Sequence, residues 1–181
     1  MRARAVALAA MLAASGGLMA GCGRAEPAPE PPPMGAPFEL AAPAQPFPEA
    51  PLTDDHRAQL GAVVAGFLVG SQEQWGDGMT QAAGIEDVIV PLLPGTDYRA
   101  AMTLEAGRPY RFVGACDYEC SNVDLELWDA GGRVVARDLM QNDTPVMDYT
   151  PTSGGLYTLR IMMQTCTITP CYAGARGLAV Q

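Results

Sequence analysis

The sequence predicts a mainly β protein, an antiparallel β-sandwich preceded by one amphipathic helix. Over residues 85–181, short runs of β-branched and aromatic residues are separated by clusters of Gly, Asn, Asp and Pro, which is typical of strands joined by turns. Two of the runs alternate apolar and polar side chains, whereas one earlier stretch has a helical period. We therefore divide the chain of 181 residues into an N-terminal segment (1–21), a Pro/Ala-rich tether (22–52), an amphipathic helix with its connector (53–84) and a β-sandwich domain (85–181).

The first segment is expected to direct export. Arg2 and Arg4 precede an apolar run over residues 5–14, which is too short to cross a bilayer and fits the hydrophobic region of a signal peptide. The following Met19-Ala20-Gly21-Cys22 resembles the bacterial lipobox, in which the cysteine receives a lipid and becomes the new N-terminus. This resemblance implies that residues 1–21 are a lipoprotein signal peptide and that Cys22 carries a membrane anchor. It also implies a place in the cell envelope, facing the periplasm or the exterior. The alternative is ordinary signal-peptidase cleavage, with Cys22 left unmodified.

The next segment is rich in proline. Residues 23–51 contain ten prolines, and the whole chain has 16. Proline lacks an N–H donor and fixes its backbone angle, so this stretch is unsuited to a helix or a sheet interior. We expect an extended, semi-rigid spacer that holds the folded domain away from the membrane.

A helix is predicted to begin at Thr53, which can cap it, with Asp54 and Asp55 in the first turn near the positive end of the helix dipole. Apolar residues then recur at helical spacing and form one stripe. Glycines within the same stretch weaken the helix, so it must be stabilised by packing. We expect the stripe to cover the protein's own core, and the alternative is a partner-binding helix. The stripe consists of Leu60, Val63, Val64, Phe67 and Leu68.

Eight strands are predicted after a Gly-rich passage. Val123, Leu125 and Leu127 alternate with Asp124 and Glu126, and Tyr157, Leu159 and Ile161 alternate with Thr158 and Arg160. Such alternation places one apolar and one polar face on each sheet of a sandwich. Pro91 would confine the first strand to an edge. The predicted ranges are 88–93, 99–104, 109–115, 123–128, 133–137, 146–149, 155–162 and 172–180.

Four cysteines besides Cys22 indicate two disulfides, because an even number in an exported chain is typical of a disulfide framework. Three connectivities are possible, and long-range bridges would stabilise the fold more than short ones in the loop-entropy model. We nevertheless predict the local pairs, because each couplet brackets a strand end where a bridge can hold an irregular loop. A four-cysteine zinc site is the alternative. The cysteines are Cys116, Cys120, Cys166 and Cys171.

From about residue 96 onward, the chain resembles the bacterial pre-peptidase C-terminal domain. The matching pieces are Leu-Glu-Ala-Gly-Arg-Pro-Tyr at 104–110, Asn-Val-Asp-Leu-Glu-Leu-Trp-Asp at 122–129 followed by two glycines, and residues 150–161. The resemblance implies a jelly-roll β-sandwich that serves as an accessory domain for secretion, targeting or surface binding, and not as a catalyst. Members often have Asp-x-Asp-Leu where this chain has Asn122 in the first Asp position.

Few residues suggest catalysis. The only histidine, His56, falls in the first turn of the predicted helix, so no Ser-His-Asp or Cys-His set is expected. Paired carboxylates suffice for a glycosidase, and Asp117, Glu119 and Asp124 are the residues that such a polysaccharide-active enzyme would use. The formal net charge of −9 argues against binding of nucleic acid.

A binding or structural module is therefore the predicted function, with an envelope protein or a polysaccharide as partner. We expect Tyr118 to be exposed between two loop cysteines, with Asp117 and Glu119 beside it, and to form the contact surface. A calcium-dependent adhesion module is an alternative, because oxygen ligands suit Ca²⁺; no other cofactor is expected. Asn122, Asp124 and Asp143, with Asn142, are the candidate ligands. The other aromatic residues of a possible binding face are Tyr110, Trp128, Tyr149, Tyr157 and Tyr172.

Overall fold

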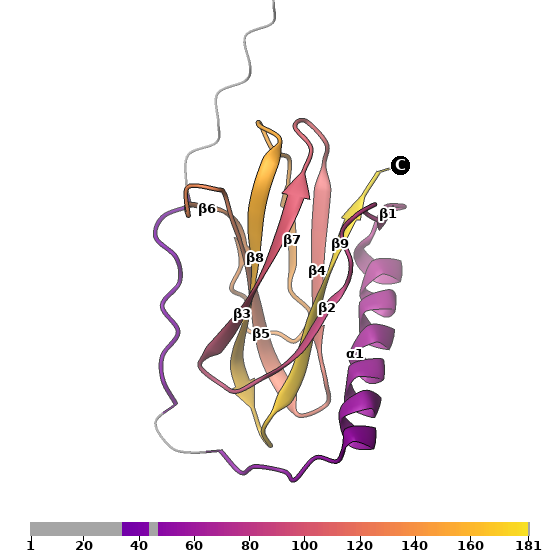
Figure 1. Cartoon of the computed structure of the whole chain (residues 1–181), viewed down its shortest axis with the longest axis vertical. Helices are drawn as coiled ribbons and strands as arrows, with labels where there is room; N and C mark the ends of the chain where they lie inside the picture. Colours follow the sequence, from indigo (N-terminus) through magenta and orange to yellow (C-terminus); the bar gives the residue numbers. More distant parts are fainter. Residues whose placement is uncertain (1–33, 44–46, 181) are drawn as a thin grey trace, which may run out of the picture.

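The computed structural model describes residues 34–43 and 47–180 and shows a β-sandwich with one helix packed against it (Figure 1). The predicted signal peptide, Cys22 and the first part of the tether lie outside the described residues. Helix α1 spans Asp54–Trp75. The strands are β1 (Thr80–Gln81), β2 (Val88–Leu92), β3 (Thr96–Leu104), β4 (Tyr110–Cys116), β5 (Cys120–Trp128), β6 (Val134–Asp138), β7 (Val146–Tyr149), β8 (Gly155–Cys166) and β9 (Cys171–Ala179).

The strands form two antiparallel sheets. One has the order β1-β9-β4-β7, with β2 also paired to β9, and the other has the order β3-β8-β5-β6. Apart from the β1–β2 and β5–β6 connections, each connection between consecutive strands crosses from one sheet to the other. This order is that of a jelly roll, so the predicted fold class is confirmed. We call the two layers the helix-side sheet and the strap-side sheet, after the segments that cover them.

The core lies between the sheets and is built from the apolar faces that the alternation predicted. Val123, Leu125, Leu127, Leu159 and Ile161 are all 1% exposed or less and belong to one hydrophobic cluster. Burial of side chains of this size contributes roughly 1.5–3 kcal/mol each, before entropy is counted. The alternation of apolar and polar residues along β5 and β8 therefore determines which face of each strand is turned toward the core.

Strand boundaries differ from the predicted ones mainly at the ends nearest the cysteines. Strand β8 continues to Cys166 and β5 begins at Cys120, because these two residues are register partners in the sheet. The short strand β1 was not predicted; its two residues pair with the end of β9. Strand β2 lies at an edge, as Pro91 predicted, because β9 is its only strand partner among the described residues.

Helix α1 covers the outer face of the helix-side sheet, as its apolar stripe predicted. The Thr53 side chain accepts a hydrogen bond from the His56 N–H at 3.3 Å and caps the helix. Val64 and Leu68 are fully buried against Ala115 and Tyr172. Gly174 of β9 permits this close packing, since a Cβ there would lie 2.9 Å from a Val64 methyl carbon and 2.7 Å from the Val88 carbonyl oxygen. No described helix has the length and apolarity needed to span a membrane.

The other sheet is covered by part of the predicted tether. Residues 34–43, which we call the strap, run along the strap-side sheet in extended form (Figure 1). The Met34 N–H donates to the Val134 carbonyl at 3.0 Å, and the Phe38 N–H donates to Glu126 at 2.8 Å. Further on, Ala50 donates to the Thr169 carbonyl at 3.0 Å. The described part of the tether is thus bound to the domain.

Candidate functional site

Two disulfides close neighbouring loops at one end of the sandwich. Cys116 is bonded to Cys120 between β4 and β5, and Cys166 is bonded to Cys171 between β8 and β9, with Cα–Cα distances of 5.9 and 6.0 Å. The predicted local pairing is confirmed. We call these two loops, residues 116–120 and 166–171, the stapled end.

The two loops are joined by backbone hydrogen bonds. The Thr167 N–H donates to the Glu119 carbonyl at 2.8 Å, and the Asp117 N–H donates to the Tyr172 carbonyl at 2.9 Å. A third segment, residues 48–50, is also hydrogen-bonded to these loops, because Thr169 donates its N–H to the Pro48 carbonyl at 2.8 Å. The stapled end is therefore held by covalent bonds and hydrogen bonds together, and its backbone has few alternative conformations.

Tyr118 projects from this end into solvent. Its side chain is 76% exposed, as the sequence predicted. The ring meets the edge of Phe67 on α1, with centroids 5.3 Å apart and planes at 89°, a geometry that aromatic pairs favour. Phe67 itself is 37% exposed, although the sequence predicted that it would belong to the buried stripe. The apolar stripe is wider than the face of α1 that contacts the sheet. Phe67, at the edge of the stripe, therefore faces the loop that carries Tyr118.

A groove of about 300 Å³ lies beside this aromatic pair, between α1 and the end of β4. Gly66 and Gly70 leave open space on the helix, since a Cβ at either position would meet nothing within 4 Å. The groove floor includes Ala115 and Cys116. The sequence signal that could have found it is the pair of glycines flanking Phe67. The remaining lining residues are Phe67, Ser71, Gln74, Asp143 and Thr144.

Asp117 is not an exposed acid beside Tyr118, although its position in the sequence predicted that it would be part of the contact surface. Its side chain is 3% exposed, and one carboxylate oxygen accepts the Tyr172 N–H at 2.7 Å. Burial raises the pKa of Asp117, while the hydrogen bond from Tyr172 opposes that rise. This carboxylate therefore ties β9 to the loop. Glu119 is half-buried and accepts a hydrogen bond from the Thr167 hydroxyl.

Of the four candidate calcium ligands, Asn122 and Asn142 lie together, whereas the side chains of Asp124 and Asp143 accept hydrogen bonds from other residues. The Asn122 side-chain oxygen accepts the Asn142 N–H at 3.2 Å, and Asp143 lines the helix groove. Asp124 lies on the strap-side sheet, where Gln164 donates to it at 2.5 Å. In the described part of the chain, no three His, Cys, Asp or Glu side chains gather as metal ligands. The carboxylates of a possible glycosidase likewise each engage a different partner.

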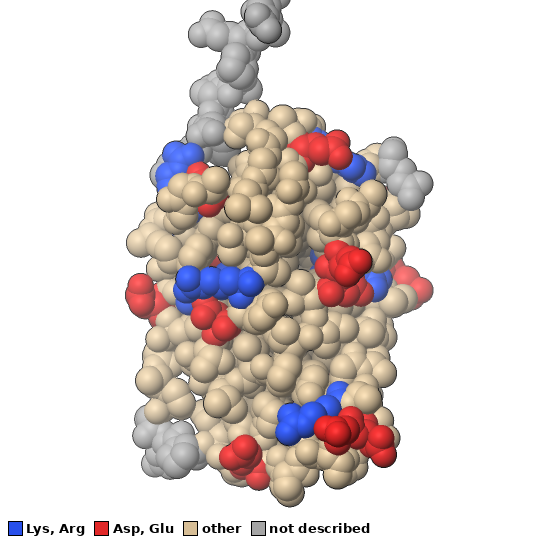
Figure 2. Space-filling view, viewed as in Figure 1, with Lys and Arg blue, Asp and Glu red and all other residues tan. Residues whose placement is uncertain are grey.

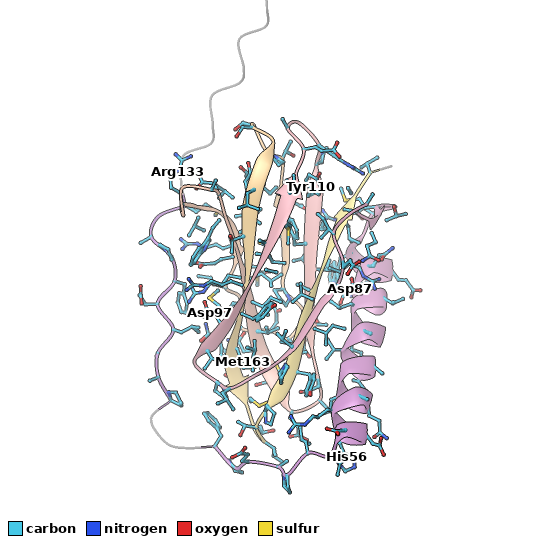
Figure 3. All side chains as sticks on the ribbon, in the orientation of Figure 1. His56, Asp87, Asp97, Tyr110, Arg133 and Met163 are labelled. Atoms are coloured by element: carbon cyan, nitrogen blue, oxygen red, sulfur yellow. A yellow bond between two sulfur atoms is a disulfide. The ribbon has the colours of Figure 1, made fainter. Side chains whose placement is uncertain are left out.

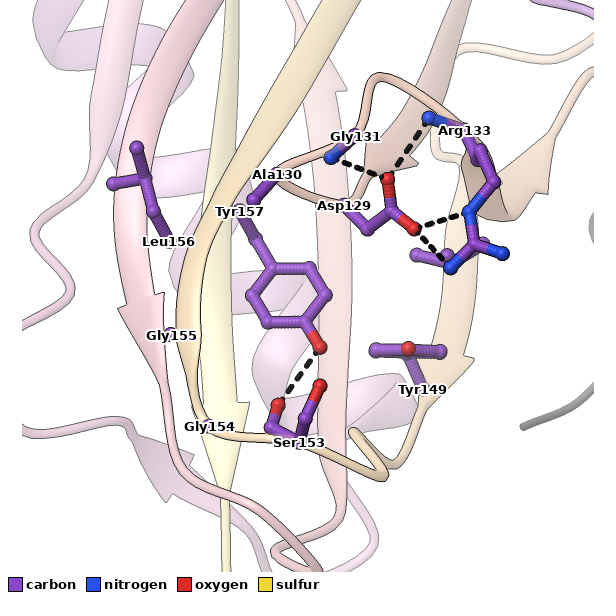
Figure 4. Close-up of a pocket in the computed structure, with 11 residues that line it drawn as sticks. Asp129, Ala130, Gly131, Arg133, Tyr149, Ser153, Gly154, Gly155, Leu156 and Tyr157 are labelled. Carbon is purple, nitrogen blue, oxygen red and sulfur yellow. Dashed lines mark hydrogen bonds and ion pairs between the residues drawn. The ribbon is translucent and has the colours of Figure 1, made fainter. Parts of the chain in front are cut away.

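A second hollow, of about 370 Å³, lies at the turns after β5 and β7, at the opposite end of the sandwich, and Figure 4 shows the residues that line it. Tyr149 and Tyr157 face it with ring centroids 5.7 Å apart. The Tyr157 hydroxyl donates to the Ser153 carbonyl at 2.9 Å, and Asp129 is paired with Arg133 at 2.7 Å. Each of these contacts lies within a single turn and stabilises that turn, so we regard this hollow as the weaker candidate. Tyr110 and Tyr172 are buried in the fold.

No protein-family model matches this chain, and the search of curated proteins finds no match either. The lipobox and the pre-peptidase C-terminal domain therefore remain resemblances in the sequence, and the site has to be interpreted from its own geometry.

Proposed function

We propose that this chain is a lipid-anchored extracytoplasmic binding module without catalytic activity, and that the stapled end is its contact surface. The observation that carries the proposal is Tyr118. Its ring is 76% exposed, although it stands on a loop closed by the Cys116–Cys120 disulfide. The contact with Phe67 covers only part of this ring and leaves most of it in water, whereas tyrosine is enriched at the centres of protein interfaces.

Rigidity favours binding at this site. A loop that already has its bound conformation loses little entropy on association, so more of the contact energy appears as affinity. Phe67 supports the Tyr118 ring from the side, which further limits the rotamers of Tyr118. The adjoining groove offers space for a side chain or a short segment of the partner.

A protein is a better match than a polysaccharide as the partner. Sugar rings stack on flat aromatic faces, but Tyr118 and Phe67 stand at 89° to each other and do not form one plane. A raised ring beside a groove is instead complementary to a folded surface with a matching pocket. We therefore assign an envelope protein as the partner class.

The two disulfides support a compartment outside the cytoplasm, because such bonds persist in oxidising environments. They are consistent with export by the N-terminal segment and with an anchor at Cys22. In this arrangement the anchor holds the module at the membrane, and the stapled end contacts the partner.

Site-specific photo-crosslinking in cells tests the contact surface. A photoreactive residue at Ser121, which is exposed beside Cys120, should crosslink the full-length protein to one envelope protein. Tyr118→Ala should reduce that adduct at least tenfold, because the central aromatic contact is lost. The matched control is Leu156→Ala, which removes a 56% exposed apolar side chain at the opposite end and should leave the adduct unchanged.

The proposal is wrong if Tyr118→Ala crosslinks as well as the unmodified protein. Cosedimentation with purified peptidoglycan that is lost in Tyr118→Ala would keep the site but replace the partner class by a polysaccharide.

A further inference from the structure

The strap is bound to the sandwich through its backbone. On the strap-side sheet, the Phe38 N–H donates to a Glu126 carboxylate oxygen at 2.8 Å, and the Phe38 carbonyl accepts from Arg160 at 2.7 Å. Arg137 reaches the Met34 carbonyl at 2.7 Å. Figure 3 shows Asp97, which pairs with Arg160, on the side of the sandwich where the strap runs. We call Asp97, Glu126, Trp128 and Arg160 the outer-face cluster.

Two members of this cluster are buried although they lie on the polar face of their sheet. Glu126 is 0% and Arg160 is 6% exposed, whereas the alternation of β5 and β8 predicted that both would face solvent. Buried charges need partners. Glu126 and Arg160 pair with each other at 3.1 Å, and the Trp128 indole N–H donates to Glu126 at 3.1 Å. Arg160 also pairs with Asp97, and the Phe38 backbone supplies one further partner to Glu126 and one to Arg160. The strap thus completes a hydrogen-bonding site that the sheet alone leaves open.

The strap adds no fully buried apolar side chain to this contact. Phe38 and Leu40 are half-buried, and Met34 is 45% exposed. Close packing occurs at Gly95, where a Cβ would lie 2.7 Å from the Ala41 carbonyl oxygen. When the strap leaves, water can replace the hydrogen bonds that the charged side chains make to its backbone. Water cannot replace an apolar contact in the same way. The chemistry of this interface therefore suits reversible binding.

We propose that the outer-face cluster is a docking site for an extended backbone and that the strap is its releasable occupant, a latch that sets the length of the membrane tether. This inference rests on the proposed lipid anchor at Cys22. With the strap docked, only residues 22–33 separate the anchor from the domain, a reach of at most about 40 Å at roughly 3.5 Å per residue. With the strap released, residues 22–47 do so, and the reach becomes about 90 Å.

Release also changes the point of attachment. The docked strap enters the domain at Val134 of β6, at the end of the sandwich opposite the disulfides (Figure 1). After release, the first contact is at Pro48 and Ala50, beside the stapled end. The docked form would hold Tyr118 far from the anchor, and the released form would hold it near. The latch therefore switches both the reach and the direction of the proposed contact surface.

Amide hydrogen exchange on the full-length protein in detergent micelles tests the latch. The Phe38 and Met34 amides should be protected, yet exchange at least 100-fold faster than the core amides of β5, because the strap opens without global unfolding. Phe38→Pro removes the N–H that Glu126 accepts and should lower protection of the Met34 amide at least tenfold. The control Phe38→Ala keeps both backbone groups and should change that protection less than threefold.

Three results would overturn the latch: no protection of the Phe38 amide, exchange as slow as that of the β5 core, or an equal loss of protection in Phe38→Ala and Phe38→Pro. The last result would mean that the side chain, not the backbone, holds the strap. Exchange does not depend on the lipid, so the absence of lipid on Cys22 would remove the tether role without affecting the measured opening.

Discussion

At the scale of single residues, periodicity predicted which way a side chain points but not what covers it. Asp124 and Glu126 do lie on the face opposite Val123, Leu125 and Leu127, yet they are 2% and 0% exposed because the strap and neighbouring side chains enclose them. The local pattern of β5 does not predict that a segment more than 80 positions away in the sequence will cover this face, as the contact between Phe38 and Glu126 shows. The exposure of Tyr118 was predictable, since it depends only on a short loop between two bonded cysteines.

Asp124 should make stability depend on pH. Burial raises its pKa to about 6, with the charges of Asp138 and Glu126 adding to the rise, and one of its buried oxygens has no hydrogen-bond partner among the described residues. A raised pKa favours the protonated form in the fold, so this contribution is complete below the unfolded pKa near 3.8 and is lost as the pH rises through about 6. Asp124→Asn removes the charge and should stabilise the protein at pH 7.5 by up to about 3 kcal/mol.

Urea unfolding at pH 4.5 and pH 7.5 checks this prediction. The stability difference between Asp124→Asn and the unmodified protein should be larger at pH 7.5 than at pH 4.5. A variant that is less stable than the unmodified protein at pH 7.5 would show that Asp124 is held charged by the fold.

At the scale of elements, helix α1 depends on tertiary packing. Gly61, Gly66 and Gly70 each reduce helix stability by about 1 kcal/mol relative to alanine, and none of them is needed to avoid a clash, since a Cβ would meet nothing within 4 Å. The helix is instead held by Val64 and Leu68 and by Arg176 of β9, which donates to Gln72 at 2.8 Å. Figure 3 shows Asp87, the other partner of Arg176, on this side of the molecule.

Leu68→Ala should therefore destabilise the protein by about 2–5 kcal/mol, because it leaves a cavity under the helix. Its neighbour Val69 is 44% exposed, and Val69→Ala should cost less than about 1 kcal/mol. Chemical denaturation followed by circular dichroism measures both values. Equal effects of the two substitutions would mean that α1 does not depend on its buried face.

At the scale of the whole molecule, the class of fold was predictable and the covering of the sheets was not. Strand number, alternation and turn residues indicate a sandwich, but the neighbours of each strand are set by residues far apart in sequence, such as Thr96 and Met163. The proline count predicted the extended form of the strap and missed its binding, which depends on Glu126 and Arg160. On the face shown in Figure 2, basic side chains lie beside acidic ones. Ion pairs such as Arg99–Asp97 and Arg111–Asp148 join opposite charges on the described part of the chain.

Membrane attachment of the whole protein should depend on Cys22. After expression of the full chain in a bacterium that processes lipoproteins, the unmodified protein should partition into the detergent phase of a two-phase extraction. Cys22→Ala should move to the aqueous phase, because it lacks the acyl chains that hold it in a bilayer. Retention of the variant in the detergent phase would mean that another segment binds the membrane.

The position of β9 has a consequence for how the chain folds. This last strand lies inside the helix-side sheet, where it pairs with β1, β2 and β4, and it also carries Tyr172, which packs against α1. Strands β1, β2 and β4 therefore lack this partner until β9, the last strand of the chain, has been synthesised. Contacts between distant parts of a chain also form slowly. The edges of β2 and β4 stay open until residues 171–179 arrive. During that interval the unpaired strands could pair with other chains, so β9 completes the sheet and ends the period in which the chain is prone to aggregate.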